Sequence, residues 1–131
     1  MCVNDGIFLR YDRSLVDKKK HACLEHWECW DTGDVKEFLG MHINQTAQHV
    51  EINQINYLKQ ILAHFDMQNV KTTPTPLPTG YNPETNTGTV DSTCQQKFQQ
   101  VIGSLLYLML GTRPDIAFAV IKMSQFLANP C

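Results

Sequence analysis

The tetrapeptide CVND at residues 2–5 places the carboxylate of Asp5 beside the amide of Asn4, directly before an apolar run at residues 7–9. Enzymes that use two divalent cations hold them with several converging carboxylates. An asparagine offers a neutral carbonyl oxygen and no negative charge, so Asp5 alone does not supply such a set. We therefore predict no metal site and no catalysis at this segment.

Other residues whose side chains could bind a metal or take part in catalysis are poorly spaced. His26 and Cys29 could act as two ligands from one helical face, but no second ligand pair follows at a usable spacing. His64 and Asp66 are near neighbours along a predicted helix, so their side chains point in different directions. The five cysteines include no CxxC pair and are expected to be reduced thiols: Cys2, Cys23, Cys29, Cys94 and Cys131. We also find no Gly-rich phosphate loop and no nucleophile elbow, and we expect no small-molecule substrate.

The overall composition is that of one small domain with a hydrophobic core. The chain has 131 residues, of which 43% are hydrophobic, and 11 basic against 13 acidic side chains give a net charge of −2. Because no global charge attracts a polyanion, any nucleic-acid contact must be local. No signal peptide is recognisable, and the longest apolar run, residues 105–110, is too short to cross a bilayer. We expect a cytoplasmic or nuclear protein with no membrane partner.

The pattern of the first half predicts a small antiparallel sheet with a helix on it. A strand is expected over residues 3–9 and a helix over 14–27, with Ser14 as its cap. A hairpin follows, with one arm at residues 35–43 and the other at 49–52. Alternation in the second arm indicates one buried and one exposed face.

The second half predicts three helices. Asn53 is expected to cap a helix over residues 54–65, whose apolar positions recur every three to four residues at Ile55, Leu58, Ile61, Leu62 and Phe65. Four prolines make residues 71–90 an extended strap. Asp91 or Ser92 then begins a helix to residue 110, and Thr112 caps a third helix to residue 127. The expected fold is therefore α+β: residues 1–53 carry the sheet and residues 54–131 form a helical bundle, as one cooperative unit.

Five motifs occur in an order and spacing that resemble the reverse transcriptase of copia-type LTR retrotransposons. They are FLGMHI at residues 38–43, YLKQIL at 57–62, TPL at 75–77, IGSLLYL at 102–108 and TRPDIA at 112–117. Several signatures met in order are far more specific than one. The resemblance implies that residues 1–53 are a palm remnant and residues 54–131 a thumb-like region, the C-terminal part of a polymerase domain.

The same resemblance implies a role for residues 2–5. The family's palm carries a Tyr-x-Asp-Asp turn, and the intact enzyme uses Mg²⁺. Here Cys2 stands at the tyrosine and Asn4 at the first aspartate, and the partner aspartate and the fingers are not in these 131 residues. We expect Asn4 and Asp5 to form a degenerate, inactive turn, with no cofactor for this chain by itself.

The resemblance also implies nucleic-acid contacts. Residues 38–52 are similar to the hairpin that grips the primer end, which puts Met41 and His42 near the primer backbone. Residues 54–65 are similar to the first thumb helix, with Gln54, Tyr57 and Lys59 on the groove side. Each of these residues also has an ordinary structural interpretation, as packing or as a solvated side chain.

Two basic features could add to these contacts. Lys18, Lys19 and Lys20, with neighbouring arginines, are the one credible electrostatic footprint for nucleic acid, and they could equally be a solvated helix face. Arg113 could contact a phosphate, although pairing with Asp115 is the preferred interpretation.

Two functions from different classes follow. The first is an inactive remnant of a retrotransposon reverse transcriptase that retains at most weak, sequence-independent binding to an RNA–DNA duplex. The second is an interaction module, homodimeric through an open strand edge at residues 7–9 or by exchange across the strap.

Overall fold

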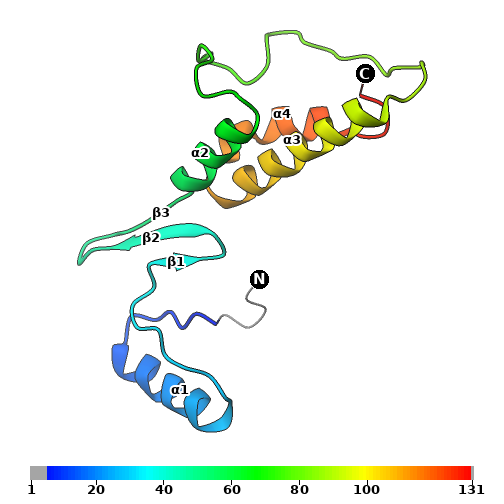
Figure 1. Cartoon of the computed structure of the whole chain (residues 1–131). Coiled ribbons are helices and arrows are strands. Elements are labelled where there is room, and N and C mark those ends of the chain that lie inside the picture. The colour runs from blue at the N-terminus through cyan, green and yellow to red at the C-terminus, as the bar shows by residue number, and fades with distance from the viewer. Residues whose placement is uncertain (1–5, 131) are drawn as a thin grey trace. The chain divides into compact units, whose positions relative to one another are not determined.

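The computed structural model describes residues 6–130, and contacts along the chain divide it into two compact units, Met1–Glu51 (unit 1) and Ile52–Cys131 (unit 2). The elements are mixed, with four α-helices, one short 3₁₀ helix and a three-stranded sheet among the described residues (Figure 1). The predicted α+β class is therefore confirmed. None of the helices in residues 6–130 combines the length and the apolarity needed to cross a bilayer.

Residues 6–10 of unit 1 have no regular secondary structure and are exposed. The strand predicted over residues 3–9 is therefore wrong over residues 6–9, and residues 3–5 lie outside the described part of the chain. A segment of apolar and β-branched residues has high strand propensity, but propensity alone forms no strand without a hydrogen-bonding neighbour.

Helix α1 spans Arg13–His26 and is capped by Asp12 rather than by Ser14. The Asp12 carboxylate accepts hydrogen bonds from the Ser14 hydroxyl at 2.8 Å and from its backbone N–H at 2.9 Å. These bonds lower the pKa of Asp12 below its usual value, the hydroxyl most strongly. The helix buries none of its residues, so the expected burial of this helix against a sheet is not seen.

Three short strands follow in the order β1-β2-β3: β1 Glu37–Phe38, β2 Met41–Gln45 and β3 Val50–Asn53. Strands β1 and β2 are antiparallel, with Phe38 opposite Met41. The turn between them is Leu39-Gly40, with φ angles of 51° and 72°. Two positive φ angles in a two-residue loop define a type I′ turn, the hairpin connection that matches strand twist. The predicted hairpin is present as the neighbouring strands β2 and β3, but its first arm, predicted as one strand over residues 35–43, is interrupted by this turn.

Leu39 is costly in this turn, because a branched side chain is disfavoured at positive φ whereas asparagine adopts that region readily. Leu39→Asn should therefore stabilise the β1–β2 hairpin by about 0.5–1 kcal/mol. Hydrogen exchange of the Ile43 N–H, which donates to Lys36 O at 2.8 Å, measures the hairpin directly. Leu39→Ala keeps the conformational cost and is the control; equal protection in both variants would contradict the prediction.

Unit 2 contains α2 (Ile55–His64), α3 (Ser92–Gly111), the 3₁₀ helix η1 (Pro114–Ile116) and α4 (Ala117–Ser124). Asp91 caps α3 by accepting from Thr93 N at 2.9 Å. This confirms Asp91, one of the two residues predicted to begin the helix. Thr112 does not begin the next helix: its N–H donates to Leu108 O and it ends α3. The third predicted helix, residues 112–127, is therefore divided into η1 and a shorter α4.

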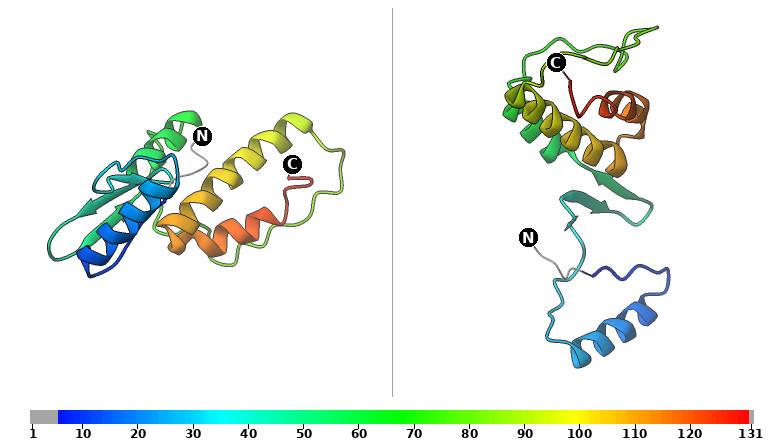
Figure 2. Two further views of the ribbon diagram at one scale, coloured as in Figure 1. Left: turned by 90° about the horizontal axis from the view of Figure 1, so that it is seen from below. Right: turned by 90° about the vertical axis from the view of Figure 1, so that its right-hand side faces the viewer.

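The core of unit 2 lies between α3 and α4, which run side by side (Figure 2). Ile102, Leu108 and Val120 are the buried hydrophobic residues of the described chain. Helix α2 contributes half-buried side chains at Leu58, Ile61, Leu62 and Phe65. Ile55, predicted to lie in the same apolar stripe, is 51% exposed, so that part of the stripe is wrong.

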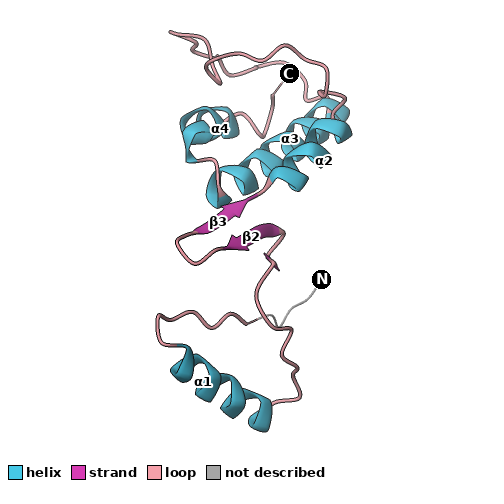
Figure 3. Cartoon of the chain, turned by 90° about the vertical axis from the view of Figure 1, so that its left-hand side faces the viewer, coloured by secondary structure: helices cyan, strands magenta, loops and turns pink. Residues whose placement is uncertain are grey.

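Residues 71–90 contain no helix or strand and run as an extended strap between α2 and α3, as the prolines predict (Figure 3). The strap is attached to the C-terminal part of unit 2 by polar groups. The Lys122 ammonium donates to Tyr81 O at 2.9 Å, and the Asn129 side chain donates to Asn86 O at 2.9 Å and to Gly88 O at 3.0 Å. Backbone groups of a segment without secondary structure are thereby satisfied.

Cysteine chemistry differs from expectation at one position. Cys23 and Cys29 are free, whereas Cys94 is disulfide-bonded. The prediction that all five cysteines are reduced thiols is therefore wrong for Cys94.

Candidate nucleic-acid interface

Helix α2 presents two distinct faces. Leu58, Ile61 and Leu62 are half-buried, whereas an opposite face is exposed and is formed by Asn56, Lys59, Gln60 and Ala63. Residues three and four apart share one side of a helix, so these four lie together. Asn56 and Gln60 were missed from sequence, although the same helical period that marks the apolar face would have placed them opposite it.

Gln54 does not share that exposed face. Its side chain is buried, with 4% of its surface exposed. Its amide nitrogen donates to Tyr107 O at 3.4 Å, and its amide oxygen accepts from the Thr112 hydroxyl at 2.8 Å. The Gln54 amide is therefore occupied within unit 2 and does not lie on the exposed face of α2.

Tyr57 points to the same side as Gln54. Its ring meets the ring of Tyr107 edge to face, with centroids 4.6 Å apart and an interplanar angle of 74°. Such aromatic pairs stabilise packing beyond the area they bury. Of the three α2 residues expected on a groove side, Lys59 alone is exposed.

The hairpin separates its two candidate residues. Met41 is half-buried and lies opposite Phe38, whereas His42 is exposed and lies opposite Glu37. Successive side chains of a strand point to opposite faces, so Met41 and His42 cannot contact one ligand from the same face.

The lysines of α1 also differ from one another. Lys18 and Lys19 are exposed, whereas the Lys20 ammonium forms an ion pair with Asp31. The hydrogen bond from Lys20, with a second from Gly33 N, lowers the pKa of the Asp31 carboxyl. Two of the three lysines therefore present free charge on the surface of α1.

Arg113 forms the structural pair that the sequence favours. Its Nε donates to Asp115 Oδ1 at 2.9 Å and its Nη2 donates to Oδ2 at 2.8 Å. This two-pronged bond lowers the pKa of Asp115 and raises that of Arg113. Because the Asp115 pKa is depressed in the folded state, the pair stabilises the fold above the ordinary carboxyl pKa. That contribution is lost as the pH falls through the lowered value.

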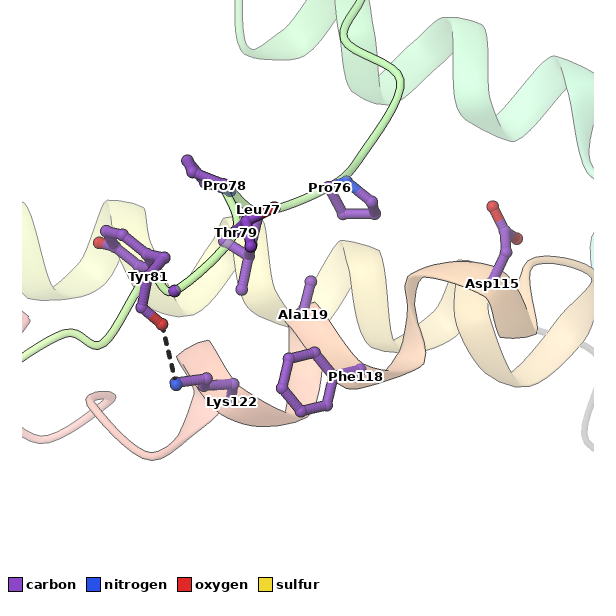
Figure 4. A pocket seen from close by; sticks show the side chains of 10 residues that line it. Pro76, Leu77, Pro78, Thr79, Tyr81, Asp115, Phe118, Ala119 and Lys122 are labelled. Carbon is purple, nitrogen blue, oxygen red and sulfur yellow. Dashed lines mark hydrogen bonds between the residues drawn. The ribbon is translucent and has the colours of Figure 1, made fainter.

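An open hollow lies between the strap and α4, with a volume of about 390 Å³ (Figure 4). Prolines and Leu77 of the strap face Phe118 and Ala119 of α4 across it. Its two charged lining groups already have partners, since Lys122 donates to Tyr81 O and Asp115 pairs with Arg113. None of the candidate nucleic-acid residues lines this hollow. Asp115, the ion-pair partner of Arg113, does line it.

Residues 6–130 contain no group of three or more His, Cys, Asp or Glu side chains placed to hold a metal ion. Asn4 and Asp5 lie outside the described residues, so the degenerate turn stays a prediction from sequence.

The family is settled by comparison with known proteins. Residues 1–79 match the reverse transcriptase (RNA-dependent DNA polymerase) family, and the chain belongs to it. This finding confirms the resemblance carried by the five motifs. No solved structure matches the chain.

The proteins similar to this chain include polyproteins of transposons. The chain is 32% identical to the retrovirus-related Pol polyprotein from transposon TNT 1-94 of Nicotiana tabacum, over 98% of this chain and 10% of that protein. It is 28% identical to the Pol polyprotein from transposon RE2 of Arabidopsis thaliana, over 98% and 9% of the two chains. A putative transposon Ty5-1 protein of Saccharomyces cerevisiae is 26% identical over 98% of this chain and 42% of its own length. The chain thus spans about a tenth of the length of the two plant relatives.

Proposed function

We propose that this chain is a palm-to-thumb segment of a copia-type reverse transcriptase that does not polymerise DNA by itself and binds RNA–DNA duplex weakly and without sequence preference. The observation that carries the proposal is the asparagine at position 4, within a chain of this family. An amide in place of an aspartate removes one negative charge from the set that would hold two magnesium ions.

The binding half of the proposal is supported by surface charge. Lys59 lies on the exposed face of α2 beside polar Asn56 and Gln60, and Lys18 and Lys19 are exposed on α1. Isolated lysines on a chain of net charge −2 attract phosphates locally and lose that attraction in salt. Weak, salt-sensitive and sequence-independent affinity is the expected result.

Primer extension on an RNA template tests the catalytic half. With Mg²⁺ or Mn²⁺ the 131-residue chain should add no nucleotide, and Asn4→Asp should not restore synthesis by itself, because the partner aspartate is supplied by another segment in the intact family. A complete reverse transcriptase on the same template is the positive control. Elongation by the unaltered chain would overturn the proposal.

Titration of a labelled RNA–DNA duplex tests the binding half. Affinity should fall steeply with salt, and Lys59→Gln should lower it several-fold and reduce the salt slope by about one unit if one phosphate contact is lost. Lys97→Gln removes the same charge from an exposed position on α3 and is the matched control. Equal effects of the two substitutions, or affinity independent of salt, would contradict an interface on α2.

The second candidate, a homodimeric interaction module, is favoured by one observation. Unit 1 leaves large apolar side chains open to solvent, among them Trp27, 69% exposed, and Trp30, 83% exposed. The open strand edge first invoked for it is absent over residues 6–9. Light scattering over a concentration series distinguishes the candidates: a monomer throughout would refute the dimer.

A further inference from the structure

The described chain buries one polar side chain, Gln54, directly before α2. The nitrogen of its side-chain amide donates to the carbonyl of Tyr107, and the amide oxygen accepts from the hydroxyl of Thr112, both at the C-terminal end of α3. These partners lie more than fifty residues away along the chain. A buried amide with both ends occupied constrains the geometry, because a displacement leaves polar groups unpaired.

Gly111 is the reason that the amide fits. A Cβ at this position would lie 2.5 Å from the Gln54 amide oxygen and 2.7 Å from its nitrogen, closer than real contacts allow. At Gly103, on the same helix, a Cβ would meet nothing within 4 Å. The last turn of α3 is thus shaped to accept this side chain.

The remainder of the α2 contact is less specific. No residue of α2 itself is buried, and its inward side chains are half-exposed. Apolar packing of that kind tolerates small rotations of a helix, whereas paired hydrogen bonds do not. The hydrogen bonds of Gln54 and the Tyr57–Tyr107 ring pair are therefore the geometrically specific contacts between the start of α2 and the end of α3.

We propose that Gln54 is a positioning residue: it locks α2 onto the last turn of α3 and so sets the direction in which Asn56, Lys59 and Gln60 face a duplex. Gln54 does not contact the duplex. The lock is a property of the fold, whereas its effect on binding rests on the proposed function.

The two glycines give a matched test of the lock. Gly103→Ala should stabilise unit 2, since alanine is the better helix former and meets no obstacle. Gly111→Ala, at the last residue of α3, gains less from this preference and must also displace the Gln54 amide, so its folding equilibrium constant should be about tenfold lower than that of Gly103→Ala, and a Gln54→Ala background should remove most of this difference. Denaturant unfolding measures both variants. Equal stabilisation by the two substitutions would overturn the lock.

A pH signature distinguishes the lock from ordinary packing. In Gln54→Glu a carboxylate can accept from Thr112 but cannot donate to Tyr107 O, whereas the protonated acid can do both. Burial should raise the carboxyl pKa of this variant, so the stability supplied by the acid is present below that pKa and lost as the pH rises. As the pH falls from about 7 to about 5, the difference in the free energy of unfolding between Gln54→Glu and the unaltered chain should become smaller. The corresponding difference for Gln54→Leu should stay the same. Parallel behaviour of the two variants would contradict the hydrogen-bonded lock.

The effect on binding is tested by a double-mutant cycle with Lys59, using variants shown by circular dichroism to be folded. Gln54→Leu should weaken duplex binding about fivefold in the unaltered chain and far less when Lys59→Gln is already present, because the two act through one contact. Equal losses in both backgrounds would overturn the positioning role. Absence of duplex binding by the unaltered chain would overturn the proposed function and the positioning role together, while the glycine and pH experiments still measure the lock.

Discussion

Leu108→Ala is expected to lower the free energy of unfolding of unit 2 by about 2–5 kcal/mol. Leu108 is 2% exposed, the most deeply buried hydrophobic residue of the core between α3 and α4. Removing three carbons there loses their transfer free energy and leaves a cavity that neighbours fill incompletely. Small domains have about 5–15 kcal/mol of stability in total, so the substitution should leave a substantial unfolded population on mild heating.

Thermal and denaturant unfolding followed by circular dichroism measure this loss. Leu110→Ala is the matched control, because it makes the same change two residues along the same helix at a side chain that is 78% exposed. It should change stability by less than about 0.5 kcal/mol. Similar losses in the two variants would show that the core does not lie where the structure places it.

Asn129→Ala is expected to release the strap. The Asn129 side chain donates to Asn86 O and Gly88 O and accepts from the Asn86 side chain at 3.2 Å. The loss removes the donor from the carbonyl of half-buried Asn86 and from the exposed carbonyl of Gly88, and should cost about 1–2 kcal/mol. Cleavage within residues 71–90 should then become several-fold faster in limited proteolysis, because an extended segment is cut when it detaches.

Asn69→Ala is the control for this effect, since Asn69 is exposed on the way into the strap. It should leave both stability and the cleavage rate nearly unchanged. If Asn129→Ala also leaves the cleavage rate unchanged, the strap is held mainly by other contacts, such as that of Lys122 with Tyr81 O.

The candidate residues at α2 lie on two different faces, and a binding experiment should treat the two faces separately. Gln54 and Tyr57 face Tyr107, so substituting them alters the position of the helix rather than a direct contact. Lys59, with Asn56 and Gln60, is the part of α2 that a duplex could reach. Affinity changes caused by the two groups have different physical origins, and the salt slope and the double-mutant cycle separate them.

The sequence alone determined the elements whose signals are local. The apolar period of residues 54–65 predicts α2, the carboxylate of Asp91 marks the start of α3, and four prolines keep the strap extended. The family, too, was readable from sequence, because five motifs retain their order. The elements depend on residues within a few positions of one another and the family on the order of motifs along the chain, so no tertiary information is needed to find either.

The tertiary structure alone decided the features that depend on distant partners. Leu39-Gly40 carries no strong signal of a type I′ turn, and it is the pairing of β1 with β2 that holds Leu39 at positive φ. The burial of Gln54 could not be found from its neighbours in sequence, because its two hydrogen-bond partners lie at residues 107 and 112. A polar side chain is buried when another segment satisfies its hydrogen bonds, and no local pattern records which segment will do so.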